Sequence, residues 1–338
     1  MTCTRNYTRQ QLAAFRIGVV LTLFIFAAGA ALPLQAQIEQ AQIEQAQTEQ
    51  APPVNHDTWT SGTAMPTARL GAAAGAIGKD IYVVGGYNNS AVFGINEIYN
   101  IKTNTWTTGA ADPSARAFTA YAVVNKILYV FGGSNFSALL SLTESYNPAT
   151  NAWTTLAPMP YVQETASAVA VKDVIYVMGG QGYDGYLTNV ASYNTTTNTW
   201  TEEAPLLISK GWSAVGKLGA SVVNTDGVAG AGGYAADTEG YTAKKNTWAE
   251  LTADPTPREA GCFAAIKNQL YVAGGNNGSL LTLNEAYNPK TKSWATLAPI
   301  PEAVWGAVAS AEVGGRMYCF GGGHYQQTVY DYVQIYQP

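Results

Sequence analysis

Few residues in this sequence combine a type and a spacing that suit chemistry. Three arginines, Arg69, Arg116 and Arg258, are each followed by a run of small residues, and guanidinium groups bind carboxylates through paired hydrogen bonds. Two tryptophans, Trp212 and Trp305, stand outside the regular spacing of the other aromatic residues. Aromatic rings of this kind stack on apolar surfaces, including the faces of sugars. Together these residues predict a site for a polar ligand such as a carbohydrate or a protein segment.

Six further residues carry carboxyl, amide, phenol or imidazole groups that suit the same site: Glu164, Tyr183, Glu259, Asn276, His324 and Tyr325. Catalysis has less support, because the chain has only two histidines and one of them, His56, lies at a linker junction. A lone loop histidine is more often solvated than a catalytic base. No cluster of His, Cys or acidic residues has the spacing of metal ligands. We therefore predict no catalytic residue, no metal and no cofactor.

The composition narrows the class of protein that could position these residues. Of 338 residues, 47% are hydrophobic, 11% aromatic and only 12% charged, with 34 Gly, 21 Tyr and 8 Trp. Soluble domains usually have about 25% charged residues, so neutral polar side chains must make up much of the polar surface of this protein. Coiled coils need Glu, Lys and Leu, and disordered chains lack aromatic residues. Both classes are excluded.

The charge balance argues against a nucleic-acid partner. The chain has 18 Lys plus Arg and 23 Asp plus Glu. Removal of residues 1–36 would leave 15 basic and 23 acidic residues, a net charge of −8. Phosphate backbones are bound by clustered Lys and Arg, and the sequence shows no such cluster.

Residues 1–36 have the pattern of an export signal. Three arginines precede the apolar run 17–32, and Ala36 ends a stretch that approximates a signal cleavage site. A retained membrane anchor is the alternative, but a spanning helix needs about 20 apolar residues, and this run is shorter. We expect cleavage, no stable membrane span afterwards, and a periplasmic, extracellular or cell-surface location.

Residues 37–55 separate the signal from the rest of the chain. Three related five-residue units beginning Ala-Gln run from Ala36 to Gln50 and are followed by a proline pair. This polar, low-complexity composition is typical of a spacer. We expect a Gln-rich linker.

An internal repeat begins at residue 56. Six diglycines recur at intervals of 42 to 53 residues: Gly85-Gly86, Gly132-Gly133, Gly179-Gly180, Gly232-Gly233, Gly274-Gly275 and Gly321-Gly322. All except the fourth follow a short apolar strand such as Ile81-Tyr-Val-Val. The fourth follows the degraded segment that begins at Gly227. A repeat of this length is typical of a propeller or a solenoid.

A second pair of residues accompanies the diglycine. Five units place a tyrosine and a tryptophan seven residues apart: Tyr99 and Trp106, Tyr146 and Trp153, Tyr193 and Trp200, Tyr241 and Trp248, Tyr287 and Trp294. The intervening Asn and Pro residues favour a tight hairpin. Each unit therefore reads as four short antiparallel strands, and we expect these aromatic residues to pack between sheets rather than to bind a ligand.

This combination of diglycine, Tyr and Trp resembles the Kelch repeat over residues 56–338. The resemblance implies an all-β fold, a six-bladed Kelch β-propeller, used to bind a protein or carbohydrate ligand; we expect a monomer. The sixth unit ends before its Trp, whereas Trp59 precedes the first diglycine. We therefore expect the N-terminal strand to supply the outer strand of the last blade, which protects the sheet edges.

In the resembled family, the register of Arg69, Arg116 and Arg258 opens into the central pocket. This implies that the three side chains point at the ligand. The alternative is that they pair with neighbouring acids or backbone carbonyls. The sequence alignment of the repeats puts Gln163, Ile208 and Val304 at this register in units three, four and six, which predicts an asymmetric pocket.

A second function remains open within the same resemblance. Exported Kelch proteins that epimerise sialic acids are six-bladed and use Glu and Arg around the pocket. Here Glu164 and Glu259 would transfer protons, and the three arginines would hold the sugar acid. A binding module is the preferred prediction and a sialic acid epimerase is the alternative.

Two cysteines, Cys262 and Cys319, lie in different predicted blades. A disulfide between them is compatible with that arrangement. We nevertheless expect two buried free thiols.

Overall fold

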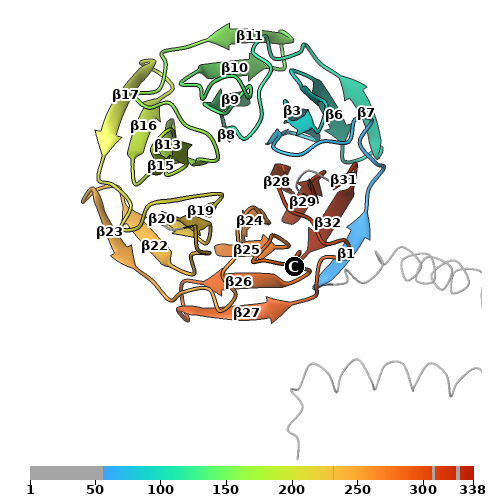
Figure 1. Ribbon diagram of the computed structural model, residues 1–338. Helices are drawn as coiled ribbons and strands as arrows, with labels where there is room; N and C mark the ends of the chain where they lie inside the picture. The colour runs from blue at the N-terminus through green and yellow to red at the C-terminus, as the bar shows by residue number, and fades with distance from the viewer. Residues whose placement is uncertain (1–55, 231, 307–308, 325–327) are drawn as a thin grey trace, which may run out of the picture. The chain divides into compact units, whose positions relative to one another are not determined.

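The computed structural model describes residues 56–230, 232–306, 309–324 and 328–338. Within these residues, six four-stranded antiparallel sheets are arranged around a central axis, which confirms the predicted six-bladed propeller (Figure 1). They belong to the unit Asn55–Pro338. The predicted signal peptide and linker lie outside the described residues.

The first three blades follow one another in chain order, and each is built from the channel outward. Blade 1 contains β2 (Ala73–Ile77), β3 (Asp80–Val84), β6 (Asn96–Asn100) and β7 (Thr105–Thr108). Blade 2 contains β8 (Ala120–Val124), β9 (Ile127–Phe131), β10 (Thr143–Asn147) and β11 (Ala152–Thr155). Blade 3 contains β12 (Ser167–Val171), β13 (Val174–Met178), β16 (Val190–Asn194) and β17 (Thr199–Glu203).

The other three blades repeat this order, and the last one joins the two ends of the propeller. Blade 4 contains β19 (Ala214–Leu218), β20 (Ser221–Thr225), β22 (Thr238–Thr242) and β23 (Thr247–Glu250). Blade 5 contains β24 (Cys262–Ile266), β25 (Gln269–Ala273), β26 (Asn284–Asn288) and β27 (Ser293–Leu297). Blade 6 contains β28 (Ala309–Val313), β29 (Arg316–Phe320), β32 (Val333–Gln337) and β1 (Thr58–Ser61). Because Trp59 lies opposite Tyr336, the predicted closure by the N-terminal strand is confirmed.

The Tyr–Trp pairs pack as the spacing predicts. Tyr146 lies directly opposite Trp153 on neighbouring strands, with ring centroids 5.3 Å apart. The tyrosine is buried and its hydroxyl donates to Asn151, while the half-buried Trp153 indole donates to the carbonyl of Ala110 near the previous blade's outer strand. The other blades repeat this arrangement, so each pair links a blade to its neighbour.

The diglycines join neighbouring blades at the point where each second strand ends. In blade 1 the amide of Gly86 donates to the carbonyl of Arg116 in the segment that leads to blade 2. Gly85 has a φ of 70°, and a Cβ atom added there would lie 2.6 Å from that carbonyl oxygen. A side chain at this position would therefore force the backbones apart.

Blade 4 departs from the predicted repeat. Its second strand, β20, ends at Thr225, and the residues with the diglycine hydrogen bonds are Asp226 and Gly227. The prediction that Gly232-Gly233 is the fourth diglycine was therefore wrong, because those residues lie in the following loop. Asp226 has a φ of 62° and is buried. An aspartate tolerates this left-handed backbone better than most residues.

The prediction about the cysteines was also wrong. Cys262 and Cys319 form a disulfide that joins β24 of blade 5 to β29 of blade 6. Adjacent strands of neighbouring blades bring the two Cα atoms to 5.8 Å, which is within the range of disulfides. The bond links two residues that are 57 positions apart in the sequence, and it ties blade 5 to blade 6, the blade that contains β1.

Candidate functional site

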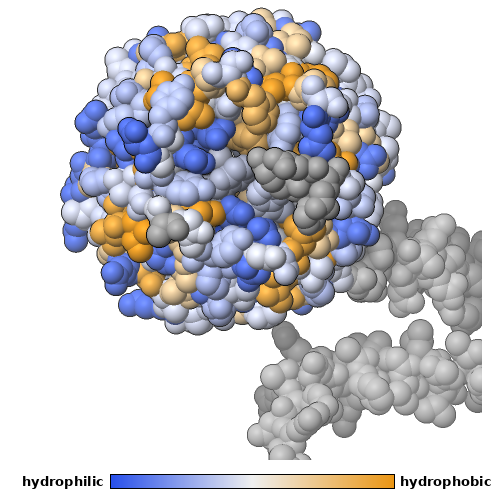
Figure 2. Space-filling model, viewed as in Figure 1, coloured by the Kyte–Doolittle hydropathy of each residue, from blue (hydrophilic) through white to orange (hydrophobic). Residues whose placement is uncertain are grey.

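The two ends of the propeller differ in their connections. We call one end the loop face: it contains the segments that follow the second strands and the segments that lead into the next blade. Four short ladders lie in these segments: β4 (Tyr87–Asn88) with β5 (Ala91–Val92), β14 (Gln181–Gly182) with β15 (Gly185–Tyr186), β18 (Lys210–Gly211) with β21 (Val228–Ala229), and β30 (Gly323–His324) with β31 (Thr328–Val329). Figure 2 shows hydrophobic residues in separate groups on the surface, divided by hydrophilic ones. We call the opposite end, with the turns between first and second and between third and fourth strands, the hairpin end.

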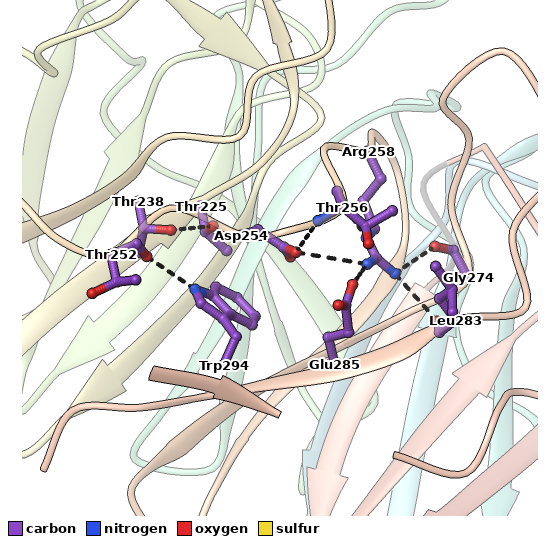
Figure 3. Close-up of polar contacts among 10 residues, drawn as sticks. All are labelled: Thr225, Thr238, Thr252, Asp254, Thr256, Arg258, Gly274, Leu283, Glu285 and Trp294. Carbon is purple, nitrogen blue, oxygen red and sulfur yellow. Dashed lines mark hydrogen bonds and ion pairs between the residues drawn. The ribbon is translucent and has the colours of Figure 1, made fainter. Parts of the chain in front are cut away.

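The three predicted arginines do not line an open pocket. Arg69, Arg116 and Arg258 are at most 1% exposed. Each guanidinium forms an ion pair with a glutamate on the third strand of its own blade: Glu97, Glu144 and Glu285. Arg258 also lies near Asp254 and donates to the carbonyls of Gly274 and Leu283, as Figure 3 shows. The alternative of pairing with neighbouring acids and carbonyls is what the structure shows.

A lysine completes this set of buried cations. The residue of blade 4 that accepts the diglycine hydrogen bond is Lys210, rather than Ile208 as the repeat alignment predicted. Lys210 is fully buried and pairs with Asp237 and Glu239. Blades 3 and 6 lack the cation and have Gln163 and Val304 at this register. They also lack the acid, because the third-strand position that is Glu97 in blade 1 is Ala191 in blade 3 and Gln334 in blade 6. Acid and base therefore occur together, as a structural pair requires.

Two residues further along the chain, five backbone hydrogen bonds between neighbouring blades form a belt around the channel mouth. The amide of Phe118 donates to the carbonyl of Gly71, and that of Thr165 to Phe118. Trp212 donates to Thr165, and Ala260 to Trp212, over 2.9 and 3.0 Å. Every residue of this belt has a positive φ, including 60° at Phe118, 58° at Thr165 and 61° at Trp212. Bulky and β-branched residues pay of order 1–3 kcal/mol for such a backbone.

The belt presents an aromatic cluster to the loop face. Trp212 stacks on Trp305 with centroids 5.9 Å apart and an interplanar angle of 24°. Phe118 meets Trp212 edge-on at 5.0 Å and continues into Tyr87 and Phe136. A cavity of about 70 Å³ lies beneath Phe118 and Trp212 at the top of the channel. Trp212 and Trp305, which the Tyr–Trp repeat did not explain, thus form a ring pair at the mouth.

Carboxyl groups border this cluster. Glu259 accepts hydrogen bonds from the Trp305 indole at 3.0 Å and from Asn276 at 3.2 Å. Burial raises the pKa of Glu259, opposed by these hydrogen bonds. Burial also raises the pKa of Glu164, opposed by a hydrogen bond with Ser134. The mouth therefore joins indole rings to carboxyl groups that hold their protons more tightly than in water.

Tyr186 is close enough to both carboxyl groups for their charges to act on its hydroxyl. Burial raises the pKa of its hydroxyl, and the charges of Glu259 and Glu164 raise it further, while a hydrogen bond with Trp212 lowers it. Tyr186 therefore connects Glu164, Trp212 and Glu259 in one cluster. We call Glu164, Tyr186, Trp212, Glu259 and Trp305 the mouth cluster.

The channel below the mouth is divided by aromatic side chains. Tyr121 and Phe263 line both the upper cavity and a second, more open cavity of about 390 Å³ nearer the hairpin end. The Tyr121 hydroxyl crosses from blade 2 to blade 6, where it accepts from the amide of Ser310 at 2.9 Å and donates to its carbonyl. The two ends of the channel thus contain separate cavities.

The other predicted site residues lie in varied places. Tyr183 is exposed, and its hydroxyl accepts from the amide of Leu139 in the loop of blade 2. Asn276 lies behind Glu259 and also contacts Tyr234. His324 is part of β30, where it pairs with Thr328. Tyr325 lies outside the described residues.

Sequence reasoning missed Phe118 and Tyr186. A signal for Phe118 exists, because it follows Arg116 by two residues just as Trp212 follows Lys210. The misplacement of the fourth register at Ile208 concealed this match. For Tyr186 the sequence offers no comparable signal, since the loops that follow the diglycines differ in length and pairing.

No group of three or more His, Cys, Asp and Glu among the described residues is arranged to hold a metal ion. Within the same residues no helix is long and apolar enough to cross a membrane.

Comparisons with known proteins agree with the repeat pattern. The family model described as Attractin/LZTR1 beta-propeller matches residues 81–276, which is more than half of the chain, and the Kelch motif model matches residues 257–301. Over 75 residues the chain is 39% identical to Kelch-like protein 35 of Mus musculus, covering 22% of this chain and 13% of that protein. The solved structure of YjhT superposes with a TM-score of 0.69 at 17% identity, covering 80% of this chain and 95% of the other.

Proposed function

The chain belongs to the Kelch-repeat β-propeller family, and we propose that it is an exported binding module whose mouth cluster recognises an uncharged carbohydrate. Kelch propellers in general serve as binding and interaction modules. The observation that carries the proposal is Trp212. Its backbone is held at a φ of 61°, at a belt position where blades 1 and 6 have Gly71 and Gly306. A glycine would satisfy the belt without strain, so the indole is held there at a cost that ligand binding would explain.

The mouth cluster has the groups that a sugar needs. Stacked Trp212 and Trp305 offer apolar ring surface, and sugar rings present C–H faces that pack on such rings. Glu164, Glu259 and the Tyr186 hydroxyl lie beside the rings and can exchange hydrogen bonds with sugar hydroxyls. Aromatic surface with a few convergent polar groups is the usual make-up of a ligand site.

The charges at the mouth favour an uncharged ligand over an anionic one. On the loop face of the described residues, all four cations are buried in ion pairs: Arg69, Arg116, Lys210 and Arg258. A sugar acid would meet Glu164 and Glu259 without a cation to offset them. The grip on a carboxylate that the family resemblance implied is therefore not supported by this geometry.

An epimerase or mutarotase acting on an uncharged sugar is a second candidate. The raised pKa values of Glu164 and Glu259 favour it, because a carboxyl group with a raised pKa is a better general acid than an ordinary one. Ring opening of a sugar needs one acid and one base close to the anomeric centre. Glu164 and Glu259, whose charges both act on the Tyr186 hydroxyl, would supply both.

The test is a glycan and peptide array followed by titration of tryptophan fluorescence. We expect uncharged oligosaccharides to bind and to change the emission of Trp212 and Trp305. Trp106→Phe, which alters a tryptophan of a Tyr–Trp pair, serves as the control and should leave the binding curve unchanged. Binding of sialic acid in preference to neutral sugars, or of peptides alone, would contradict the proposal. Accelerated anomer interconversion in proton NMR, lost in Glu259→Gln, would select the enzymatic candidate.

A further inference from the structure

The exposed cations of the described residues all lie at the hairpin end. Eleven lysines and arginines are exposed, and each is in, or within two residues of, a turn joining the first and second or third and fourth strands: Lys79, Lys102, Lys126, Lys172, Lys217, Lys244, Lys245, Lys267, Lys290, Lys292 and Arg316. In the sequence these residues are scattered. The repeat gathers them, because every blade returns its turns to the same end.

Six of these cations surround the hairpin-end mouth of the channel, one from each blade. They are the residues at the turns between first and second strands, and we call them the cationic ring: Lys79, Lys126, Lys172, Lys217, Lys267 and Arg316. Lys217 also lines the open cavity of about 390 Å³. No other element packs over these turns in the described chain, so the ring faces solvent.

Few acids offset this charge. Five acidic residues lie at the same turns or beside them, namely Asp57, Asp80, Asp173, Glu203 and Glu312. Glu203 belongs to this set because the Tyr241 hydroxyl lies within hydrogen-bond distance of both Glu203 and Asn246 in the outer turn of blade 4. All five carboxylates accept hydrogen bonds from neutral groups. Eleven cations against five acids leave the hairpin end with a net charge of +6. The described domain as a whole has 15 basic and 20 acidic residues, so its charge is strongly polarised.

The chain also enters the propeller at this end. β1 starts at Thr58 opposite Gln337, the last residue of β32, and His56 contacts the carbonyl of the C-terminal Pro338 at 2.9 Å. The described part of the chain therefore begins at the cationic end.

We propose that the hairpin end is a docking surface for an anionic lipid bilayer, which holds the mouth cluster on the loop face away from the membrane. A ring of one cation per blade, extended by lysines of the outer hairpins, is spread over two dimensions. A planar sheet of headgroups matches such a distribution, whereas an acidic peptide would contact only a strip of it. Basic residues near an anionic bilayer add attraction that falls off within a Debye length, and the acidic loop face is repelled, so the charge separation sets the orientation.

The experiment measures sedimentation of the full chain with lipid vesicles. We expect the protein to bind vesicles containing roughly one third phosphatidylglycerol far better than pure phosphatidylcholine, with the difference lost at about 0.5 M salt. Lys79→Gln, Lys126→Gln and Lys267→Gln together should weaken binding at least about tenfold. The matched control is Ser90→Asp, Ser137→Asp and Ser279→Asp, which changes the net charge equally but on exposed loop-face residues, and it should bind as the unaltered chain does.

Three results would overturn the proposal. Equal binding of the lysine variant and the unaltered chain would remove the ring from the interaction. Equal binding to both lipids at all salt concentrations would assign the attachment to the apolar N-terminal segment. Binding to soluble polyglutamate without binding to vesicles would replace the bilayer with an acidic protein partner. Thermal melts of both variants establish that they are folded, and carbohydrate binding at the mouth cluster is a separate readout that the variants should leave unchanged.

Discussion

Arg116 and Phe118 are two residues apart in one connecting segment, yet the fold places their side chains in different environments. Arg116 is buried and paired with Glu144, whereas Phe118 belongs to the belt and the aromatic cluster at the mouth. The same contrast recurs in blade 4 between Lys210 and Trp212. We call the four buried cations and their acids the buried layer; the cations are Arg69, Arg116, Lys210 and Arg258. In each of these blades the cation links the connecting segment to the third strand, and the belt residue follows it two positions later.

The difference shows how a repeat separates stability from recognition. Residues of the buried layer are fixed in pairs, since a buried cation without its acid is costly. Residues of the belt are linked by backbone hydrogen bonds, and side chains as different as Gly, Ala, Thr, Phe and Trp occur there. Variation among the blades is therefore found in the belt at the channel mouth.

The strongest test of this comparison is Arg116→Ala. Loss of the guanidinium leaves Glu144 and Asp112 buried without a cation, and breaking a buried pair costs about 3–5 kcal/mol. Chemical denaturation should show this loss in the free energy of unfolding. Burial already raises the pKa of Asp112 to about 7 against the pull of Arg116, so the penalty should be smaller at pH 5, where Asp112 is protonated.

A double variant separates the pair from its charge. Arg116→Met with Glu144→Leu removes the cation and one of its two buried acids, and such apolar replacements are often neutral or stabilising. The other acid, Asp112, has a pKa raised to about 7 and is protonated at pH 5, so we expect the double variant to recover most of the lost stability when unfolding is measured at pH 5. If Arg116→Ala unfolds with unchanged stability but loses ligand binding, the assignment of Arg116 to the buried layer is wrong.

Asp226 offers a second test of the buried layer with a smaller effect. Its carboxyl group is fully buried, and burial, with the charge of Asp254 and a hydrogen bond shared with that residue, raises its pKa well above the ordinary value. The folded state therefore binds this proton more tightly than the unfolded chain does. The stability that the proton supplies is present below the ordinary pKa and is lost as the pH rises through the folded pKa.

Asp226→Asn keeps the shape, accepts the positive φ and cannot ionise. Relative to the unaltered protein we expect equal stability near pH 4 and a gain of roughly 1–3 kcal/mol at pH 8, the cost of a buried charge without full hydrogen bonding. Urea unfolding at both pH values measures the difference. A gain that is the same at pH 4 and pH 8 would show that Asp226 does not titrate in the folded state.

The fold could be predicted from the sequence because its signals are local and repeated. Gly85, Tyr99 and Trp106 each report one fixed contact of a blade, and five repetitions remove the ambiguity of a single match. Asp226 shows the limit of this approach. The fourth diglycine was predicted at Gly232-Gly233 because two adjacent glycines stand there. The spacing gives the correct position instead: Asp226 follows Trp212 by 14 residues, just as Gly132 follows Phe118.

The site could be predicted only in part. The loop face and the importance of Trp212 and Trp305 follow from strand direction and from the residues that the repeat leaves over. The direction of a side chain does not follow, and for this reason Arg116 was placed at the ligand. Whether a guanidinium turns toward the pocket or toward Glu144 depends on a third strand 28 residues away, and only the packed blade decides it.

The belt is tested by Trp212→Ala, which should have the smallest effect on stability and a large effect on binding. Ala260 occupies the equivalent belt position of blade 5 with a φ of 54°, so the backbone of blade 4 can accept alanine. Relief of backbone strain offsets part of the lost packing on Phe118 and Trp305, and we expect a net loss under about 2 kcal/mol. Affinity for an uncharged oligosaccharide should fall at least about tenfold, as loss of a stacking ring does. If the variant kept its affinity but lost stability, Trp212 would have a structural role only. The belt would then not differ in role from the buried layer.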